Sequence, residues 1–406
     1  MVFLLARATR RTTLAHVRHV TPVRPAAAHG LVSQVYRQVE RDFGMLAPPI
    51  SLHSPAPGPL AAVWVMLRES LVATGLAARQ GKEAVAATIS RANSCPYCVE
   101  VHGATLRGLL RDPDSAAVAE GRLDGVTDPA LRALAGWARG EGPAPFPAAH
   151  APELLGVAVT FHYVNRMVNV FLQESPFPAH VPAAVLPRVR GFAARLMGTL
   201  AKDGRTPGAA LDLLPAAKLP DDLRWAADRP TVAEAFARGA AAIEAAGEHA
   251  VPDRVRELVL NRLAAWDGTP LGLGARGTVE DAVHRLPAGE RAAGRLALLT
   301  ALASYQVTDA VVGEFRPDSP DDRSLVELTS WASFAAARRI GLLLHGAAPG
   351  HGPGPADVGR VPDGGRPWRA DVGPGRPATG GPDRSATSVG PDRPATGVGP
   401  ARAEES

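Results

Sequence analysis

The spacing of hydrophobic and polar residues predicts a chain made almost wholly of helices. Apolar residues recur at three- and four-residue steps, which is the period of a helix with one buried face. The segments that show this pattern are 29–46, 59–71, 82–92, 124–140, 154–172 and 189–200. No segment shows the strict two-residue alternation of a half-buried β-strand. The sequence therefore predicts an all-α fold.

A helical hairpin in the first quarter of the chain holds the residue types with the most evident chemistry. Its first helix is rich in alanine, and Asn93 and Ser94 then favour a break and a helix cap. Pro96 suits the first turn of a second helix. The two cysteines of the sequence, Cys95 and Cys98, form a C-x-x-C pair in this turn. Because the partial positive charge of a helix start favours a thiolate, we expect a reactive thiol here.

Two further polar residues fall at positions from which they can act on these thiols. His102 follows Cys98 by one helical turn, and Glu83 precedes Cys95 by twelve residues. At the rise of an α-helix, Glu83 lies about 14 Å before the hairpin turn and His102 about 10 Å after it. An antiparallel hairpin would bring the two side chains to about the same level. The carboxylate, the imidazole and a thiol can then form a proton relay, so all four residues are predicted to be catalytic.

These residues resemble the motif of the alkylhydroperoxidase D (AhpD)/carboxymuconolactone decarboxylase family. The peroxidase branch of that family carries a glutamate followed by C-x-x-C-x-x-x-H. Glu83, Cys95, Cys98 and His102 match this pattern residue by residue. The sequence departs from the pattern at Tyr97, where the type member of the family has a second histidine. A role for that second imidazole therefore does not carry over to this chain.

The resemblance covers about residues 30–172 and implies an AhpD-like helical bundle with thiol peroxidase activity. It implies that a hydroperoxide is the substrate and that the cysteine pair cycles through a disulfide. An unidentified dithiol or redox partner protein must then reduce that disulfide. This chemistry needs no cofactor and no metal. Since members of the family bury apolar helical faces between subunits, we also expect a homo-oligomer.

The second half of the sequence is interpreted as a degenerate copy of the first. Residues 256–272 overlay 82–98 at a constant offset of 174, and a second overlay farther along has nearly the same offset. The copy keeps a glutamate, but Thr269, Gly272 and Arg276 stand where the two cysteines and the histidine would be. It is therefore predicted to perform no thiol chemistry.

Changes of composition divide the chain into five predicted parts. These are a basic N-terminal arm (1–29), an AhpD-like catalytic domain (30–172), a proline-rich helical connector (173–225), a degenerate second AhpD-like domain (226–346) and a tail (347–406). The arm has arginines and no acidic residue, which is typical of a solvated segment and alternatively of a surface for acidic partners. The Gly/Pro/Arg-rich tail buries too little apolar surface to offset its ordering entropy, so it is predicted to be disordered.

Charge and hydropathy favour a cytoplasmic protein without a nucleic-acid or membrane partner. A net charge of +4 over 406 residues does not by itself indicate nucleic-acid binding. The apolar run at the N-terminus is too short for a secretion signal, and polar residues interrupt the apolar run 154–172. A single closely spaced cysteine pair is also more typical of a catalytic or metal site than of a secreted disulfide scaffold.

A stripe of polar residues interrupts the apolar run and allows two interpretations. His162, Asn165, Arg166 and Asn169 lie at positions i, i+3, i+4 and i+7 of the predicted helix 154–172. They form either the wet face of an amphipathic helix or the lining of a pocket or subunit interface. In the second case His162, like Tyr97, is a candidate for supporting the catalytic residues.

Three alternatives to a peroxidase remain open from the sequence. Cys95, Cys98 and His102, with Glu83 as a fourth ligand, have spacings that permit a zinc site. Cofactor-free decarboxylation of a lactone acid is the activity that names the wider superfamily, although it is not known to need a cysteine pair. A redox-sensing interaction protein without enzymatic turnover would suit the duplicated half and the long tail.

Overall fold

The computed structural model describes residues 14–176, 184–316 and 321–346, and their regular secondary structure is helical. Within these ranges, β-type pairing is limited to an isolated antiparallel bridge between Val17 and Leu172. The predicted all-α fold is confirmed. The tail 347–406, which was predicted to be disordered, lies outside the described residues, as do residues 1–13 of the arm.

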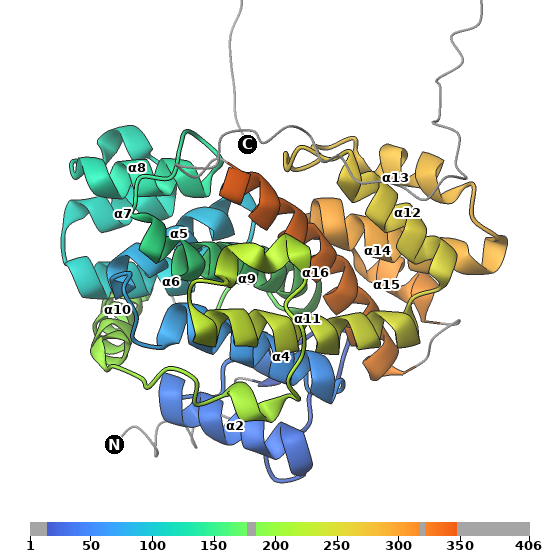
Figure 1. Cartoon of the computed structure of the whole chain (residues 1–406), viewed down its shortest axis with the longest axis horizontal. Coiled ribbons are helices and arrows are strands. Elements are labelled where there is room, and N and C mark those ends of the chain that lie inside the picture. Colours follow the sequence, from blue (N-terminus) through green and yellow to red (C-terminus); the bar gives the residue numbers. More distant parts are fainter. Residues whose placement is uncertain (1–13, 177–183, 317–320, 347–406) are drawn as a thin grey trace, which may run out of the picture. The chain divides into compact units, whose positions relative to one another are not determined.

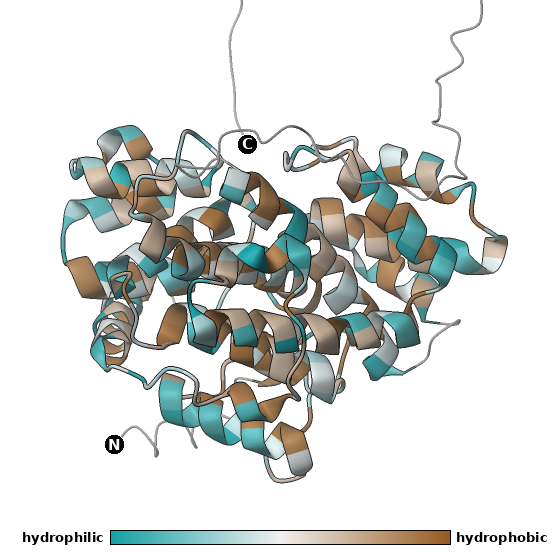
Figure 2. Ribbon diagram, viewed as in Figure 1, coloured by the Kyte–Doolittle hydropathy of each residue, from teal (hydrophilic) through white to brown (hydrophobic). Residues whose placement is uncertain are grey.

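The first half begins several of its helices at a proline, whose fixed φ and missing N–H suit the first helical turn. Its helices are α2 (Gly30–Phe43), α3 (Pro48–Ser51), α4 (Pro57–Leu67), the π-helical turn η1 (Arg68–Val72), α5 (Arg79–Ala92), α6 (Pro96–Leu110), α7 (Pro113–Glu120), η2 (Leu123–Gly125), α8 (Pro129–Ala138), η3 (Ala148–His150) and α9 (Ala151–Phe171). Figure 2 shows a hydrophilic and a hydrophobic side on α2, as the sequence pattern predicts.

The described parts of the connector and the second half are also built from helices. Their helices are α10 (Leu186–Lys202), η4 (Leu211–Leu213), η5 (Asp221–Ala226), α11 (Pro230–Ala250), α12 (Asp253–Ala264), α13 (Ala275–Val283), η6 (Ala288–Glu290), α14 (Arg291–Ala303), η7 (Ser304–Gln306), α15 (Asp309–Phe315) and α16 (Asp322–Gly346). Among the described residues, none of these helices is both long and apolar enough to cross a membrane.

One predicted helix is wrong in its extent. The segment 124–140 was expected to be continuous, but it divides into η2 and α8. Asp128 accepts hydrogen bonds from the N–H groups of Ala130 and Leu131, and so caps a new helix that Pro129 begins. A residue before proline is disfavoured in the α conformation, which explains why the first turn cannot run on into the second.

The order and packing of the helices fit the expected duplication. At the offset of 174, α4 with η1 corresponds to α11, α5 corresponds to α12, and α9 corresponds to α16. Figure 1 shows α9 beside its equivalent α16, and α4 likewise packs against its equivalent α11. Buried apolar residues from both halves belong to one continuous core. The two halves therefore pack through equivalent helices and share a hydrophobic core.

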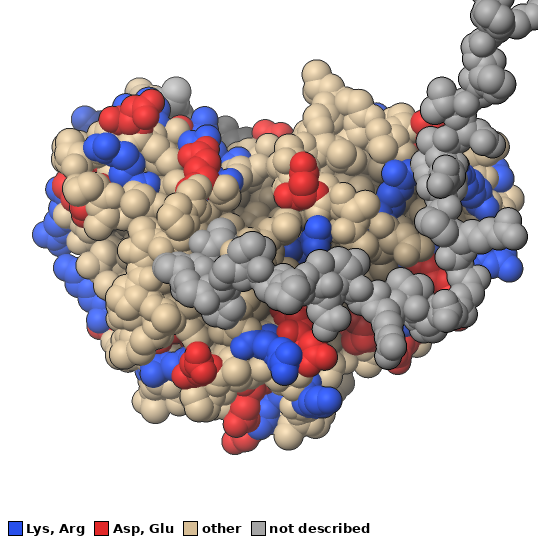
Figure 3. Space-filling view, turned by 45° about the horizontal axis from the view of Figure 1, so that its top comes forward, with Lys and Arg blue, Asp and Glu red and all other residues tan. Residues whose placement is uncertain are grey.

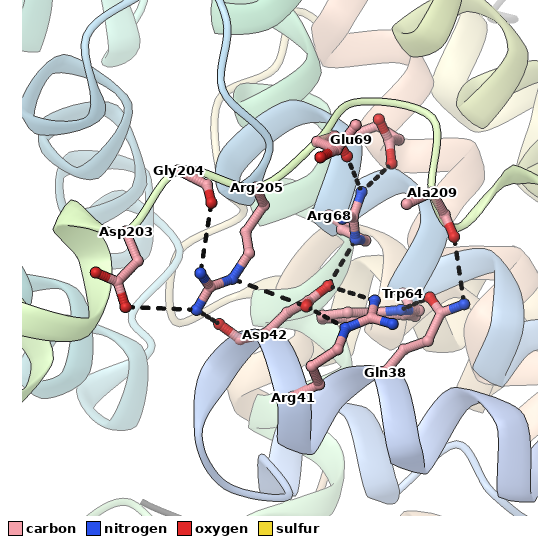
Figure 4. A network of polar contacts seen from close by, with 11 residues as sticks. Gln38, Arg41, Asp42, Trp64, Arg68, Glu69, Asp203, Gly204, Arg205 and Ala209 are labelled. Carbon is pink, nitrogen blue, oxygen red and sulfur yellow. Dashed lines mark hydrogen bonds and ion pairs between the residues drawn. The ribbon is translucent and has the colours of Figure 1, made fainter.

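A buried ionic network fixes the connector to the first half (Figure 4). Arg68 on η1 donates to Asp42 of α2 at 2.7 Å and to the neighbouring Glu69 at 2.6 Å, and it also binds the carbonyl oxygen of Thr206. Arg205 of the connector approaches the same Asp42 carboxylate at 3.8 Å. The guanidinium groups and carboxylates balance one another, so their burial does not leave an isolated charge. The connector around residue 205 is thus a packed segment.

The described part of the basic arm also packs against the helices. The N–H of Arg18 donates to the carbonyl oxygen of Phe171 at the end of α9, and the N–H of Val23 donates to the Ser54 hydroxyl. This differs from the expectation of a solvated arm, because the backbone hydrogen bonds could not be foreseen from arginine content. On the face shown in Figure 3, basic and acidic side chains of the described residues are interspersed and do not form a patch of one sign.

Candidate active site

The α5–α6 hairpin turns tightly around Ser94. Ser94 has a φ of 51°, in the left-handed region that non-glycine residues seldom adopt. The N–H of Cys95 donates to the carbonyl oxygen of Ser90 at 2.9 Å, which closes the turn. Cys95 itself occupies the N-cap position of α6, and Pro96 is the first helical residue. The cap was expected at Asn93–Ser94, so the helix begins slightly later than predicted, and Cys98 lies in its first turn.

The hairpin brings Glu83 and His102 together, as the helical rise predicted. His102 Nδ1 lies 2.7 Å from Glu83 Oε2. The second carboxylate oxygen of Glu83 accepts a hydrogen bond from Arg79 Nε at 2.9 Å. The His102 ring packs edge-on against Phe161 of α9, with 4.5 Å between the ring centroids. The imidazole is thereby held in one orientation by a carboxylate on one side and an aromatic ring on the other.

Glu83 is an ionised carboxylate in a buried position, with 1% of its surface exposed. Burial alone would raise the pKa of Glu83, but the Arg79 guanidinium and the His102 imidazole stabilise the carboxylate more strongly, so its pKa lies below the usual range. A carboxylate accepts hydrogen bonds and does not donate them, so His102 Nδ1 is the donor in this pair. The other ring nitrogen, Nε2, is left to accept a proton.

The two cysteines are free thiols, and both are buried. The Cys98 thiol lies close enough to Cys95 and Asn165 for both to act on its pKa. Burial and the neighbouring Cys95 sulfur raise the pKa of Cys98 well above the usual thiol value, while Asn165 acts in the opposite direction. Among the described residues, no hydrogen bond joins His102 to either thiol. In this state Cys98 is a protonated thiol that needs a base before it can react.

The polar stripe of α9 lines the interior beside the thiols. Asn165 is fully buried, and His162 is 7% exposed. Asn93, in the hairpin turn, donates to Asn165 Oδ1 at 3.0 Å, and its amide nitrogen lies 3.0 Å from His162 Nδ1. Asn169 donates to the carbonyl oxygen of Asn93 at 2.9 Å. The wet-face interpretation is therefore wrong, and the stripe holds the hairpin turn against α9.

The two supporting candidates occupy different parts of this arrangement. Burial, assisted by the positive charge of Arg166, lowers the pKa of His162 well below its usual value, so His162 is a neutral hydrogen-bond partner of the turn. Tyr97 is also buried, and burial together with the two cysteines raises the pKa of its hydroxyl. Sequence reasoning did not single out Asn165 as a thiol partner. Its place in the stripe, three residues after His162, was the available signal.

A pocket of about 570 Å³ reaches the start of α6 and is lined by Cys95 but not by Cys98. One wall comes from the hairpin turn and the end of α9. The opposite wall comes from the second half, where Tyr305 and the segment Val307 to Ala310 line it. Arg18 of the arm completes the rim. The two halves of the chain therefore build this pocket jointly, and Cys95 is the cysteine that contributes to its lining.

The equivalent position in the second half has neither the tight turn nor the chemistry, since α12 ends at Ala264 and α13 begins only at Ala275. Gly268, which corresponds to Ser94, also has a positive φ of 92°. Thr269 and Gly272 follow it in place of the cysteines, and the Arg276 side chain donates to the carbonyl oxygen of Gln306. Within the described ranges, no three side chains of His, Cys, Asp or Glu are grouped so that they could hold a metal ion.

The chain is similar in sequence to a curated mycobacterial protein. It is 38% identical over 342 residues to the protein named alkyl hydroperoxide reductase Rv2159c of Mycobacterium tuberculosis, and the match covers 82% of this chain and 96% of the relative. A match of this extent includes parts of both halves, so it is not confined to the thiol motif. No family model matches the chain, and no solved structure matches it.

Proposed function

Because the chain belongs to the AhpD-like family of the alkyl hydroperoxide reductase that it matches, we propose that it reduces hydroperoxides with the Cys95–Cys98 thiol pair. The observation that carries this proposal is the 2.7 Å contact between Glu83 and His102 on the hairpin that also holds the two thiols. A thiol pair supplies the electrons, and an oriented imidazole with a buried carboxylate supplies the base. These are the groups that thiol-dependent peroxide reduction requires.

The oxidative step is assigned to Cys98. His102 Nε2 accepts the Cys98 proton, directly or through water, and Glu83 stabilises the imidazolium that forms. The thiolate attacks the terminal oxygen of the hydroperoxide, the O–O bond breaks, and the alkoxide leaves and takes up a proton as the alcohol. Cys98 becomes a sulfenic acid. Since burial raises the pKa of Cys98, a dedicated base explains how a buried thiol reacts near neutral pH.

The pair then closes to a disulfide. The Cys95 thiol attacks the Cys98 sulfenic acid, the S–O bond breaks, and water leaves. Cys95 at the N-cap and Cys98 in the first turn of α6 are close enough to act on each other, so little movement is needed. An external dithiol returns two electrons and two protons and restores both thiols. Our proposal therefore includes the C-x-x-C-x-x-x-H peroxidase branch as the finer assignment.

Steady-state consumption of hydrogen peroxide and of an alkyl hydroperoxide, measured with several dithiol donors, tests the proposal. The parent protein should turn over, and the Cys95→Ser and Cys98→Ser proteins should not. Reversible disulfide formation without turnover with any donor would instead support a redox sensor. Turnover that persists after loss of either cysteine would overturn the thiol mechanism.

A further inference from the structure

A groove in the second half occupies the position that corresponds to the α5–α9 interface of the first half. It has a volume of about 680 Å³, and α11, α12 and α16 supply most of its lining. At the offset of 174, α12 corresponds to α5 and α16 corresponds to α9. Whereas α5 packs closely along α9, α12 meets α16 over fewer residues. A groove of this size falls within the roughly 300–1,000 Å³ typical of small-molecule sites.

Two lining residues lack the contact that closes the corresponding interface. In the first half, Asn165 of α9 donates to the Ser90 hydroxyl of α5 at 3.1 Å and so joins the two helices. At the offset of 174, Ala264 stands in place of Ser90, and Arg339 stands in place of Asn165. Alanine has no hydroxyl, and Arg339 Nε donates instead to the carbonyl oxygen of Trp266 at 3.0 Å. The bond between Asn165 and Ser90 therefore has no counterpart at these two positions.

Much of the lining of the groove is apolar. Trp331 and Phe334 of α16 contribute aromatic rings to it. Leu260 of α12 and Leu342 of α16 also line it, although 51% and 39% of their surface is open to solvent. Removal of such apolar surface from water is favourable by about 25 cal/mol per Å². The groove therefore favours a ligand with an apolar body.

The charged residues of the groove leave positive charge without a partner. Arg338 donates to the two oxygens of Asp222 at 2.6 Å each, and its guanidinium lies 3.8 Å from the Glu244 carboxylate. Lys218 and Arg339 also line the groove, but within the described ranges neither forms an ion pair. The lining thus has three cations and two carboxylates, and both carboxylates already have a cation. An anionic group on the ligand would be the complementary partner of the other two cations.

We infer that this groove binds a small organic acid, whose carboxylate meets Arg339 and Lys218 and whose apolar chain or ring lies against Trp331 and Phe334. A guanidinium is suited to this role because its planar N–H groups match the two oxygens of a carboxylate. The groove shares no lining residue with the pocket that Cys95 lines. Binding here needs no thiol, so the inference does not rest on the proposed peroxidase function.

Isothermal titration calorimetry of the full-length chain with octanoate tests the inference. The neutral 1-octanol and the cationic octylammonium have the same chain and serve as comparison probes. Because the cations are partly exposed, octanoate should bind about fivefold more tightly than 1-octanol at low salt, and octylammonium should bind more weakly than 1-octanol. High salt should remove most of the difference between the three probes.

Substitutions locate the site. Ala241→Trp fills the groove from an exposed position on α11 and should weaken octanoate binding by about tenfold or more. Ala288→Trp, at an exposed alanine of η6 outside the groove, is the matched control and should bind like the parent. Lys218→Met should weaken octanoate binding by about threefold and leave 1-octanol binding unchanged. Lys202→Met, at an exposed lysine of α10, should change neither.

Three results would contradict the inference. The absence of octanoate binding, or equal binding of octanoate and 1-octanol at low salt, would exclude an organic-acid site. Unchanged octanoate binding in Ala241→Trp would place the acid elsewhere on the molecule. An octanoate affinity that falls as the protein concentration rises would show that a second copy of the chain covers the groove. Because these titrations contain no peroxide, failure of the peroxidase proposal would not alter any of them.

Discussion

Replacement of Glu83 by glutamine tests whether this carboxylate takes part in proton transfer or has only a structural role. The two side chains have nearly the same volume, so the charge is the main difference. The glutamine can still accept a hydrogen bond from His102, but it carries no charge to stabilise the imidazolium. A hydrogen bond to a charged group contributes about 1.5–3 kcal/mol, and each 1.36 kcal/mol corresponds to about a factor of ten in rate. If this stabilisation is needed when Cys98 loses its proton, oxidation by peroxide near neutral pH should slow by about ten- to one-hundred-fold.

The pH dependence distinguishes the base from other roles. In the Glu83→Gln protein, hydroxide and buffer must remove the thiol proton, so the oxidation rate should rise with pH and recover much of the loss in alkaline solution. Single-turnover oxidation by hydrogen peroxide, measured by stopped flow across this range, reports the rate directly. A Glu83→Gln protein with the parent's rate at every pH would refute the reasoning. The control is Glu100→Gln, at a glutamate on the same helix α6 as His102. This substitution breaks the ion pair with Arg190 of α10 and should leave the profile unchanged.

The same substitution has a predictable effect on stability. The pKa of Glu83 is lower in the folded protein than its ordinary value of 4.5, so the ionised form stabilises the fold. This contribution is fully present above the ordinary value and is lost as the pH falls through the lower folded value. The difference in unfolding free energy between the parent and Glu83→Gln should therefore be about 1–3 kcal/mol at neutral pH and should shrink in acid. Urea denaturation at both pH values measures it, and a difference that grows in acid would contradict the sign.

Four further outcomes are expected. After peroxide treatment, mass spectrometry should find sulfenic acid on Cys98 in the Cys95→Ser protein, and its appearance only on Cys95 in the converse variant would reverse the assignment. Lys82→Met should lose about 3–5 kcal/mol in urea denaturation, because it leaves the buried Glu153 carboxylate without the ammonium that lies 2.8 Å away, and a second change, Glu153→Gln, should restore part of the loss. Gly108→Ala would place a methyl group 2.0 Å from a backbone carbonyl oxygen of α10, so the melting temperature should fall by several degrees and protease should cut α10 sooner. Sedimentation velocity should show an oligomer, and a compact monomer at micromolar concentration would contradict that expectation.

The part of the site that the sequence could predict is the part that depends on helix geometry. The rise and period of two adjacent helices place Glu83 and His102 at one level, whatever the rest of the chain does. The structure brings them within 2.7 Å. The first turn of α6 likewise follows from Pro96 and the break before it. These features need only local rules and a hairpin that closes antiparallel.

The contacts that the sequence could not predict depend on packing between distant segments. A lysine is usually exposed at the surface. Lys82, however, is 1% exposed and pairs with Glu153 at the start of α9. The polar stripe has the period of a wet helix face, and only its packing against the hairpin shows that Asn165 reaches Cys98. Periodicity shows which residues share a face, but it does not show what that face meets.

The contacts of α9 give a physical reason for a second half without thiols. The stripe that holds the hairpin also contacts the second half: Arg166 donates to the carbonyl oxygen of Ala301 at 2.8 Å, and Asn169 donates to the Ser304 hydroxyl at 3.0 Å. Without these partners, a buried guanidinium and a half-buried amide would lose hydrogen bonds, at a cost of about 1–3 kcal/mol for the buried group. The second half can therefore lack cysteines at little cost, whereas its packing surface against α9 cannot change freely. The position of the thiol pair depends on a half of the chain that does not react.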